Sequence, residues 1–268
     1  MKSTRVVAIH QPNFLPWFGF FHKMTCADVF VLLDTVPYSK NSYQNRVKMK
    51  MPQGASWLTV PVLTKGRFGQ LTSEVEIKDS IGWRKTHMLT LTNSYRRAPF
   101  FDQTMAWLER VYEQPTILLA QFNQQAIQEM VDQLGLETEL VLASELAASG
   151  RGSQHLLELV QQVGGDVYLS GASGRQYLDE TIFVQAGIQV RYQEFEYPSY
   201  PQQHGAFVRG LSMVDLLMNV GPQEARRYLE AASVTEEGIA GPAESRSVNG
   251  STVNGSGQAA NPQLAAKV

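Results

Sequence analysis

The chain has 268 residues, of which 43% are hydrophobic, 10% aromatic and 18% charged. A chain with this length and apolar content can bury a large core, which excludes a miniprotein and a wholly disordered protein. Its one cysteine, Cys26, excludes an internal disulfide and a cysteine-based zinc site. The sequence shows neither an export signal nor an apolar stretch long enough to cross a membrane, so we expect a cytoplasmic protein.

The formal net charge of -2 hides an asymmetry along the chain. Residues 1–100 carry 14 Lys or Arg against 5 Asp or Glu, whereas residues 101–268 carry 9 against 20. A basic half attracts anionic small molecules, such as a nucleotide, a nucleotide-sugar or an activated acyl donor. Attraction between the two halves explains the asymmetry equally well. A nucleic-acid partner is disfavoured because the basic residues form no known reader motif.

Two short apolar runs near the N-terminus predict buried strands. Residues 5–9 (RVVAI) and 28–33 (DVFVLL) are continuous and rich in β-branched residues, as in strands covered on both faces. Between them, aromatic residues recur at helical spacing from 16 to 27, and this length suits a crossover helix. The unit therefore indicates a largely parallel sheet.

A β-hairpin is predicted next. Residues 43–50 and 55–62 read as strands on either side of a Met-Pro-Gln-Gly turn. Because side chains alternate along a strand, Arg46, Lys48 and Lys50 share one face. We expect that face to be exposed and basic.

The rest of the chain alternates helices and strands. Helices are predicted at 82–95, 115–134 (opening on Pro115), 153–163 and 212–219, with a polar helical segment continuing to about 232, and strands at 166–170 and 188–195. This pattern predicts an α/β fold with a predominantly parallel central sheet, flanking helices and the basic hairpin as an insertion. We expect one domain over residues 1–237. Residues 238–268, rich in Gly, Ser, Asn and Ala, predict a disordered low-complexity tail.

The first candidate site segment follows the first strand. Ligands of open α/β sheets bind outside the carboxyl ends of the strands, and His10 lies at such a strand end. Gln11, Asn13 and Trp17 follow it in a proline-rich loop, Gly19 would allow close backbone approach, and the amides of the next helix start could hold a phosphate. A rigid turn that merely buries its aromatic residues is the alternative.

The second segment follows the second strand and reaches the same edge. It carries Asp34, Lys40, Asn45 and Arg46. Lys and Arg suit phosphate or carboxylate recognition, Asn suits neutral polar groups, and the Asp34 carboxylate could orient the His10 ring. A solvated charged hairpin is the alternative explanation for its basic residues.

Two later loops add further candidates. Ser173 and Arg175 lie in a glycine-containing loop after a strand, an arrangement that often binds anions, although ordinary turn chemistry explains it as well. Tyr200 and His204 lie in an aromatic, proline-rich loop, where Tyr200 could wall a pocket and His204 could act as an acid or base. An ordered surface loop is the alternative there. The remaining histidines (His22, His87 and His155) are expected to be structural, and no metal-ligand spacing is present.

Several of these segments carry a family resemblance. The sequence resembles the WbqC-like family in IHQPNFLPWFGFFHK, DVFVLLDTVPYSKNSYQNR, WLTVPV, YLSGASGRQYLDE, YPSYPQQHG and LSMVDLLMNVG, which together span residues 6 to about 221. Members of that family are associated with bacterial surface-polysaccharide (O-antigen) gene clusters, and transfer of glycine or another aminoacyl group to a sugar has been suggested for some. The resemblance supplies no catalytic residues.

The leading hypothesis is a transferase that attaches a small acyl or aminoacyl group, such as glycine, to an amino-sugar precursor of a surface polysaccharide. His10 would be the general base, oriented by Asp34, and Lys40, Arg46 and Arg175 would hold phosphates. A nucleotide-binding enzyme of the nucleotidyl-transferring or amino-acid-activating type is the runner-up, although the loop lacks a paired His-x-x-His signature. The third hypothesis is a non-enzymatic sugar- or nucleotide-binding protein.

Overall fold

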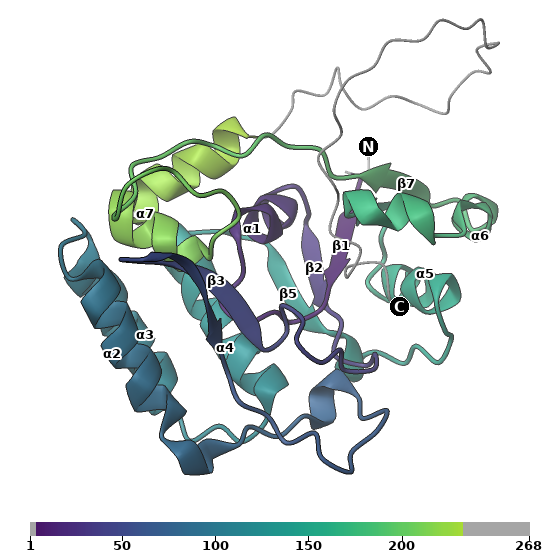
Figure 1. Cartoon of the computed structure of the whole chain (residues 1–268). Helices are drawn as coiled ribbons and strands as arrows, with labels where there is room; N and C mark the ends of the chain where they lie inside the picture. Colours follow the sequence, from purple (N-terminus) through teal and green to yellow (C-terminus); the bar gives the residue numbers. More distant parts are fainter. Residues whose placement is uncertain (1–3, 233–268) are drawn as a thin grey trace, which may run out of the picture.

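A five-stranded parallel sheet forms the centre of the computed structural model, which describes residues 4–232 (Figure 1). The strands are β1 (Val6–His10), β2 (Val29–Leu32), β5 (Glu139–Leu142), β6 (Val167–Ser170) and β7 (Gln189–Tyr192), in the spatial order β5-β2-β1-β6-β7. All four pairings between neighbours are parallel. The α/β fold with a parallel sheet is thus confirmed, and the predicted tail at 238–268 lies outside the described residues.

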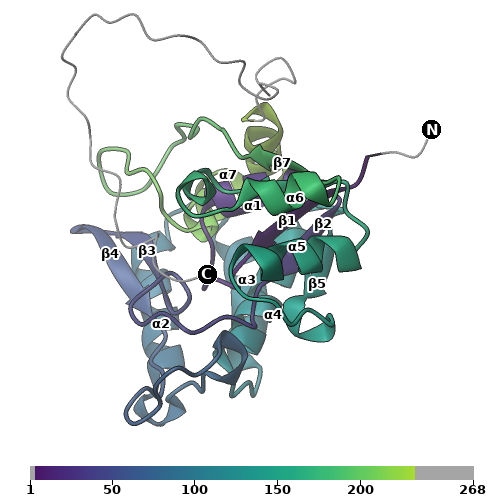
Figure 2. The same ribbon diagram turned by 90° about the vertical axis from the view of Figure 1, so that its right-hand side faces the viewer.

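The sheet is buried on both faces because its strands alternate apolar side chains between two cores. Ala8 and Phe30 point into a core shared with α1 (Phe18–Thr25), α4 (Leu119–Leu134) and α7 (Met213–Ala231). Val7 and Val31 point into a second core with α5 (Ser153–Gln162) and α6 (Glu180–Gln185). Figure 2 shows α5 and α6 in front of the sheet. The chain is therefore a three-layer helix–sheet–helix structure.

The long connection between β2 and β5 contains the predicted hairpin. Strand β3 (Arg46–Met51) pairs antiparallel with β4 (Gly54–Thr59), so the hairpin is confirmed with shorter strands than predicted. Its apolar face joins the core, and the opposite face carries Arg46 and Lys48, both half-buried. Lys50 departs from the prediction of an exposed basic face, because the loop around 202–206 covers it and leaves it 1% exposed.

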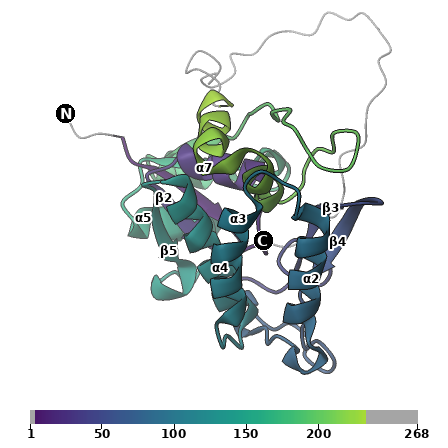
Figure 3. The same cartoon turned by 90° about the vertical axis from the view of Figure 1, so that its left-hand side faces the viewer.

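Three helices stand beside the hairpin: α2 (Trp83–Tyr95), α3 (Phe101–Glu113) and α4 (Figure 3). The sequence prediction did not assign α3 or the short edge strand β5. It also started α4 too early, because the helix begins at Leu119, after Leu118, whose backbone is extended and forms a bridge with Glu76. Helix α7 combines the predicted helix and the polar segment after it, with a kink at Gly221, whose φ is 77°.

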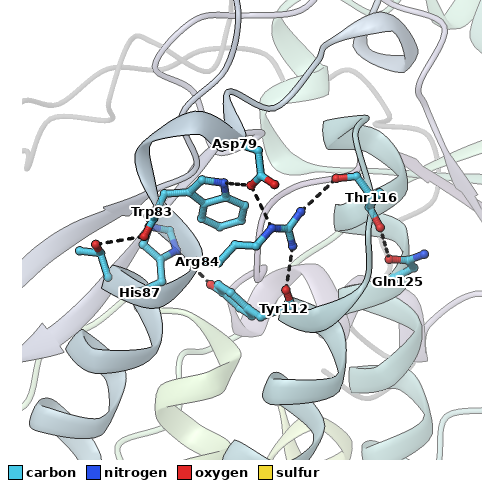
Figure 4. Close-up of polar contacts among 9 residues, drawn as sticks. Asp79, Trp83, Arg84, His87, Tyr112, Thr116 and Gln125 are labelled. Carbon is cyan, nitrogen blue, oxygen red and sulfur yellow. Dashed lines mark hydrogen bonds and ion pairs between the residues drawn. The ribbon is translucent and has the colours of Figure 1, made fainter.

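A half-buried arginine fastens α2 to the end of α3 (Figure 4). Arg84 donates to the backbone carbonyls of Tyr112 and Thr116, each at 3.0 Å, and to a carboxylate oxygen of Asp79 at 3.1 Å. His87 accepts from the Tyr112 hydroxyl at Nδ1 and donates to a backbone carbonyl at Nε2. Burial lowers the pKa of His87 to about 4, so it is a neutral, structural histidine.

Among residues 4–232, no helix combines the length and the apolar character that crossing a membrane requires.

Candidate functional site

The topology of the sheet places the candidate site at the end of its central strand. His10 is the last residue of β1 and pairs in register with Leu32 of β2. On the other side Ala8 pairs with Leu169, so continuation of the register brings Gly171 beside His10. After β1 the chain turns to α1 on one face, and after β6 it turns to α6 on the other face. This is a topological switch point, where open α/β sheets bind their ligands.

His10 is held in one tautomer. Its Nδ1 lies 3.1 Å from the Gln11 carbonyl, and because a carbonyl only accepts, Nδ1 carries the proton and Nε2 keeps its lone pair. The ring is half-buried and packs edge-on against Trp17 and Phe20, with centroids 5.6 and 5.1 Å away. Burial, and secondly the charge of Lys23, lower the pKa of His10 to about 3. The imidazole is therefore neutral at physiological pH.

Lys23 is a site residue that the sequence prediction missed. It lies on α1, is 3% exposed, and its Nζ donates to the Ile9 carbonyl at 2.7 Å, one residue before His10. Burial lowers its pKa to about 7. A lysine in an aromatic amphipathic helix resembles an ordinary surface residue in sequence, and only the packing of α1 against the sheet shows that it is buried.

Aromatic side chains extend from His10 to the hairpin. Trp17 lies 4.9 Å from Tyr43 between ring centroids, and Tyr43 lies 5.6 Å from Trp57 on β4. The Arg46 guanidinium lies 4.3 Å from the Trp57 ring centroid and the Lys48 ammonium 5.4 Å. We call this chain of His10, Trp17, Tyr43, Arg46, Lys48 and Trp57 the aromatic wall. It brings together three predicted site residues (His10, Trp17 and Arg46) and three that the sequence prediction did not assign to the site (Tyr43, Lys48 and Trp57).

One asparagine positions the two loops that supply the aromatic wall. Asn123 of α4 is fully buried, and its Nδ2 donates to the carbonyls of Pro12 and Gln44, both at 2.8 Å. The Phe14 amide also donates to the Tyr43 carbonyl at 2.9 Å. The loops after β1 and β2 are thus tied together by helix α4, a long-range contact that no local pattern predicts.

Asp34 does not orient His10 in the described structure. Its two carboxylate oxygens accept from the amide and hydroxyl of Ser144, at 2.9 and 2.6 Å, because Ser144 follows β5, the next strand along from β2. Asn13 and Asn45 are also turned inward, 3% and 4% exposed, and Asn45 donates to the Val60 carbonyl. Lys40 is exposed. The second segment therefore contributes Arg46 to the aromatic wall, while Asp34 and Asn45 bond to other parts of the chain.

The start of α1 differs from the expected phosphate cradle. A Cβ on Gly19 would lie 2.5 Å from Phe195, so the close approach that this glycine allows is to an aromatic side chain. Gln193 strengthens the contact by donating to the Gly19 carbonyl at 2.8 Å and to His22 Nδ1 at 2.9 Å. The segment after β7 thus covers this helix start, which the sequence alone could not show.

The third loop forms a short 3-10 helix at Ala172–Gln176. Gly174 packs on Ser170 so closely that any side chain there would collide with the serine hydroxyl. Ser173 is half-buried, whereas Arg175 is exposed and pairs with Glu194 at 3.0 Å while stacking on Tyr192. The predicted phosphate-binding arginine is therefore neutralised by a carboxylate at the surface.

The fourth loop belongs to a separate buried cluster. The hydroxyls of Tyr200 and Tyr95 donate to the two carboxylate oxygens of Asp215, at 2.8 and 2.7 Å. His204 is exposed, and its Nε2 donates to the Ser94 carbonyl at 2.7 Å. These contacts tie the loop to α2 and α7. The hydrogen-bond partners of His204 and Tyr200 are therefore Ser94 and Asp215, and not His10.

No three His, Cys, Asp or Glu side chains within residues 4–232 come together in a way that could hold a metal ion.

The sheet order and the histidine at its switch point define a doubly wound α/β protein with a candidate small-molecule site. The profile of the WbqC-like protein family matches residues 11–227. This range includes every site residue predicted from the sequence except His10, which lies one position before it. The chain therefore belongs to the WbqC-like family.

A relative with the same span is found in Mycobacterium tuberculosis (strain ATCC 25618 / H37Rv). The chain is similar to the uncharacterized protein Rv1507c of that organism, with 36% identity over 225 residues that cover 83% of this chain and 96% of the relative. No solved structure matches the chain.

Proposed function

We propose that the protein is a transferase that attaches a small acyl or aminoacyl group, such as glycine, to the amine of an amino-sugar precursor of a surface polysaccharide. The observation that carries the proposal is the neutral His10 ring, fixed by the Gln11 carbonyl with its Nε2 lone pair unprotonated, at the switch point of the sheet. The aromatic wall beside it offers the apolar ring faces on which sugars stack. Membership of the WbqC-like family supports the choice of substrate class.

In the proposed reaction, the amine nitrogen of the sugar attacks the acyl carbonyl carbon. The C–N bond forms, the bond from the carbonyl carbon to the leaving group breaks, and one amine proton passes to His10 Nε2 and then to the leaving group. The nitrogen gains positive charge and becomes more acidic as it attacks, which favours transfer of its proton to the neutral imidazole. Lys23 contributes indirectly, because it holds the Ile9 carbonyl next to His10 and because its ammonium keeps the imidazole unprotonated before the sugar amine arrives. Lys23 is thus a positioning residue.

The test is a steady-state comparison of wild type with His10→Gln. Glucosamine 1-phosphate and UDP-glucosamine serve as acceptors, acetyl-CoA or glycine with ATP serves as donor, and product is detected by mass spectrometry. We expect wild type to form an amide on the sugar. His10→Gln should lower kcat about 10²- to 10⁴-fold, with KM nearly unchanged.

His155→Gln is the matched control, because His155 bonds Thr35 on the other side of the sheet and should leave turnover unchanged. Normal turnover by His10→Gln would refute the role of His10. Glycine-dependent exchange of pyrophosphate into ATP, with no amide formed on the sugar, would favour the amino-acid-activating alternative. Binding of the sugar without turnover by wild type, with every donor, would favour a binding protein.

A further inference from the structure

Two cations of the aromatic wall have no carboxylate to neutralise them. Arg46 and Lys48 take part in none of the seven ion pairs found among residues 4–232, which instead pair other arginines with Asp or Glu. Both lie over the ring of Trp57, at 4.3 and 5.4 Å. This face of the hairpin therefore carries two positive charges that can meet an anion.

Two enclosed hydrogen-bond donors accompany these charges. Arg46 Nε and the Tyr38 hydroxyl are both buried, and neither has a hydrogen-bond partner. They belong to one neighbourhood, since the charge of Arg46 acts on the Tyr38 phenol against the burial that raises its pKa to about 12. An unpaired buried donor is costly to the folded protein. Each of these groups is an N–H or O–H donor and therefore lacks an acceptor, a role that phosphate oxygens can fill.

Trp57 supplies an apolar platform at the same place. It is 38% exposed although it is a large aromatic residue, and it pairs directly across the hairpin with Lys48. Its ring meets Tyr43 edge-on, and Tyr43 leads through Trp17 to His10. A flat ring stacked on Trp57 would thus lie at one end of the aromatic wall, with the reacting group at the other end.

We infer that the Trp57 end of the aromatic wall binds a nucleoside diphosphate, with the base stacked on Trp57 and the two phosphates held by Arg46, Lys48 and Tyr38. The inference rests on the proposed function, because it makes the substrate a nucleotide-linked sugar whose sugar extends toward His10. A diphosphate matches the two unpaired cations in charge, and its oxygens supply the acceptors that Arg46 Nε and Tyr38 lack. An aromatic base matches the exposed indole, which a bare phosphate would leave uncovered.

The inference is tested by calorimetric titration of the full chain with UDP, GDP, ADP and dTDP. Uridine and inorganic pyrophosphate are the two comparison ligands. We expect at least one nucleoside diphosphate to bind, at least tenfold more tightly than either comparison ligand. Arg46→Gln should weaken its binding about tenfold to a hundredfold, since a charge-assisted contact is lost. Trp57→Leu should weaken it about fivefold to a hundredfold, since base stacking is lost.

Lys65→Gln is the matched control, because Lys65 is an exposed cation outside the aromatic wall. The Lys65→Gln variant should bind the nucleotide as tightly as wild type. The far-ultraviolet circular dichroism of each variant verifies that it is folded. Failure of all four nucleotides to bind, or unchanged binding by a folded Arg46→Gln variant, would overturn the inference. Equal binding of pyrophosphate and nucleotide, with no effect of Trp57→Leu, would overturn the nucleoside assignment.

The result is separable from the proposed transfer reaction. His10→Gln should bind the nucleotide as wild type does, because His10 lies at the far end of the aromatic wall. Nucleotide binding without amide formation would refute the transferase while supporting this inference. Amide formation without nucleotide binding would support the transferase and refute this inference.

Discussion

Replacement of Lys23 by methionine should change how stability depends on pH. Lys23 is 3% exposed, its Nζ has the Ile9 carbonyl as a partner, and burial lowers its pKa from 10.5 to about 7. At about 1.4 kcal/mol per pH unit, this difference means that burial disfavours the ammonium by about 5 kcal/mol. Methionine keeps the unbranched chain and removes the charge, at the cost of one hydrogen bond, worth about 1–3 kcal/mol.

The sign follows from proton binding. Between pH 7 and pH 10.5 the unfolded chain holds the Lys23 proton and the folded chain has largely released it, so the free energy of unfolding rises with pH. From pH 7 to pH 9 this one group should raise the stability of wild type by about 2 kcal/mol. Lys23→Met lacks this contribution, and its stability near pH 7 should equal or exceed that of wild type.

The assay is urea unfolding of both proteins at pH 7, 8 and 9, below the range in which tyrosines ionise in the unfolded chain. Lys85→Met is the control, because Lys85 is exposed on α2 and its curve should run parallel to that of wild type. If wild type and Lys23→Met also remain parallel from pH 7 to pH 9, the pKa of Lys23 is not lowered in the folded chain, and the reasoning from its burial is refuted.

Two further predictions concern packing contacts, one at the start of α1 and one between α2 and the end of α3. Gly19→Ala should lower the free energy of unfolding by about 1–3 kcal/mol, because its Cβ collides with Phe195. In thermal unfolding, the double variant with Phe195→Ala should lose less stability than the two single variants lose together. Strict additivity of the two losses would refute the contact. Arg84→Met should lower the free energy of urea unfolding by about 2–3 kcal/mol, because two buried backbone carbonyls lose a charged donor (Figure 4). Arg110→Met removes a surface ion pair with Glu129 and should cost less than about 1 kcal/mol, so equal losses in the two arginine variants would contradict this explanation.

The sequence by itself determined the elements whose signal is local. The runs of β-branched residues predicted β1 and β2, and the two-residue alternation separated the apolar face of β3 from the face that carries Arg46 and Lys48. It also placed His10 at a strand end, because the apolar run stops there. Strand β5 was missed, although β7 has the same length, also lies at an edge of the sheet and was predicted.

The partners of the polar side chains were decided only by the tertiary structure. Asp34 and Arg175 had the right chemistry for the predicted site, yet Asp34 binds Ser144 and Arg175 binds Glu194, both distant in sequence. Lys23 was overlooked because the chain must fold before the packing of α1 removes its ammonium from water. Hydrophobic periodicity depends on neighbours a few residues away, whereas hydrogen bonding and desolvation depend on segments that only the completed sheet brings together. The fold class could therefore be predicted from the sequence, while the composition of the aromatic wall required the structure.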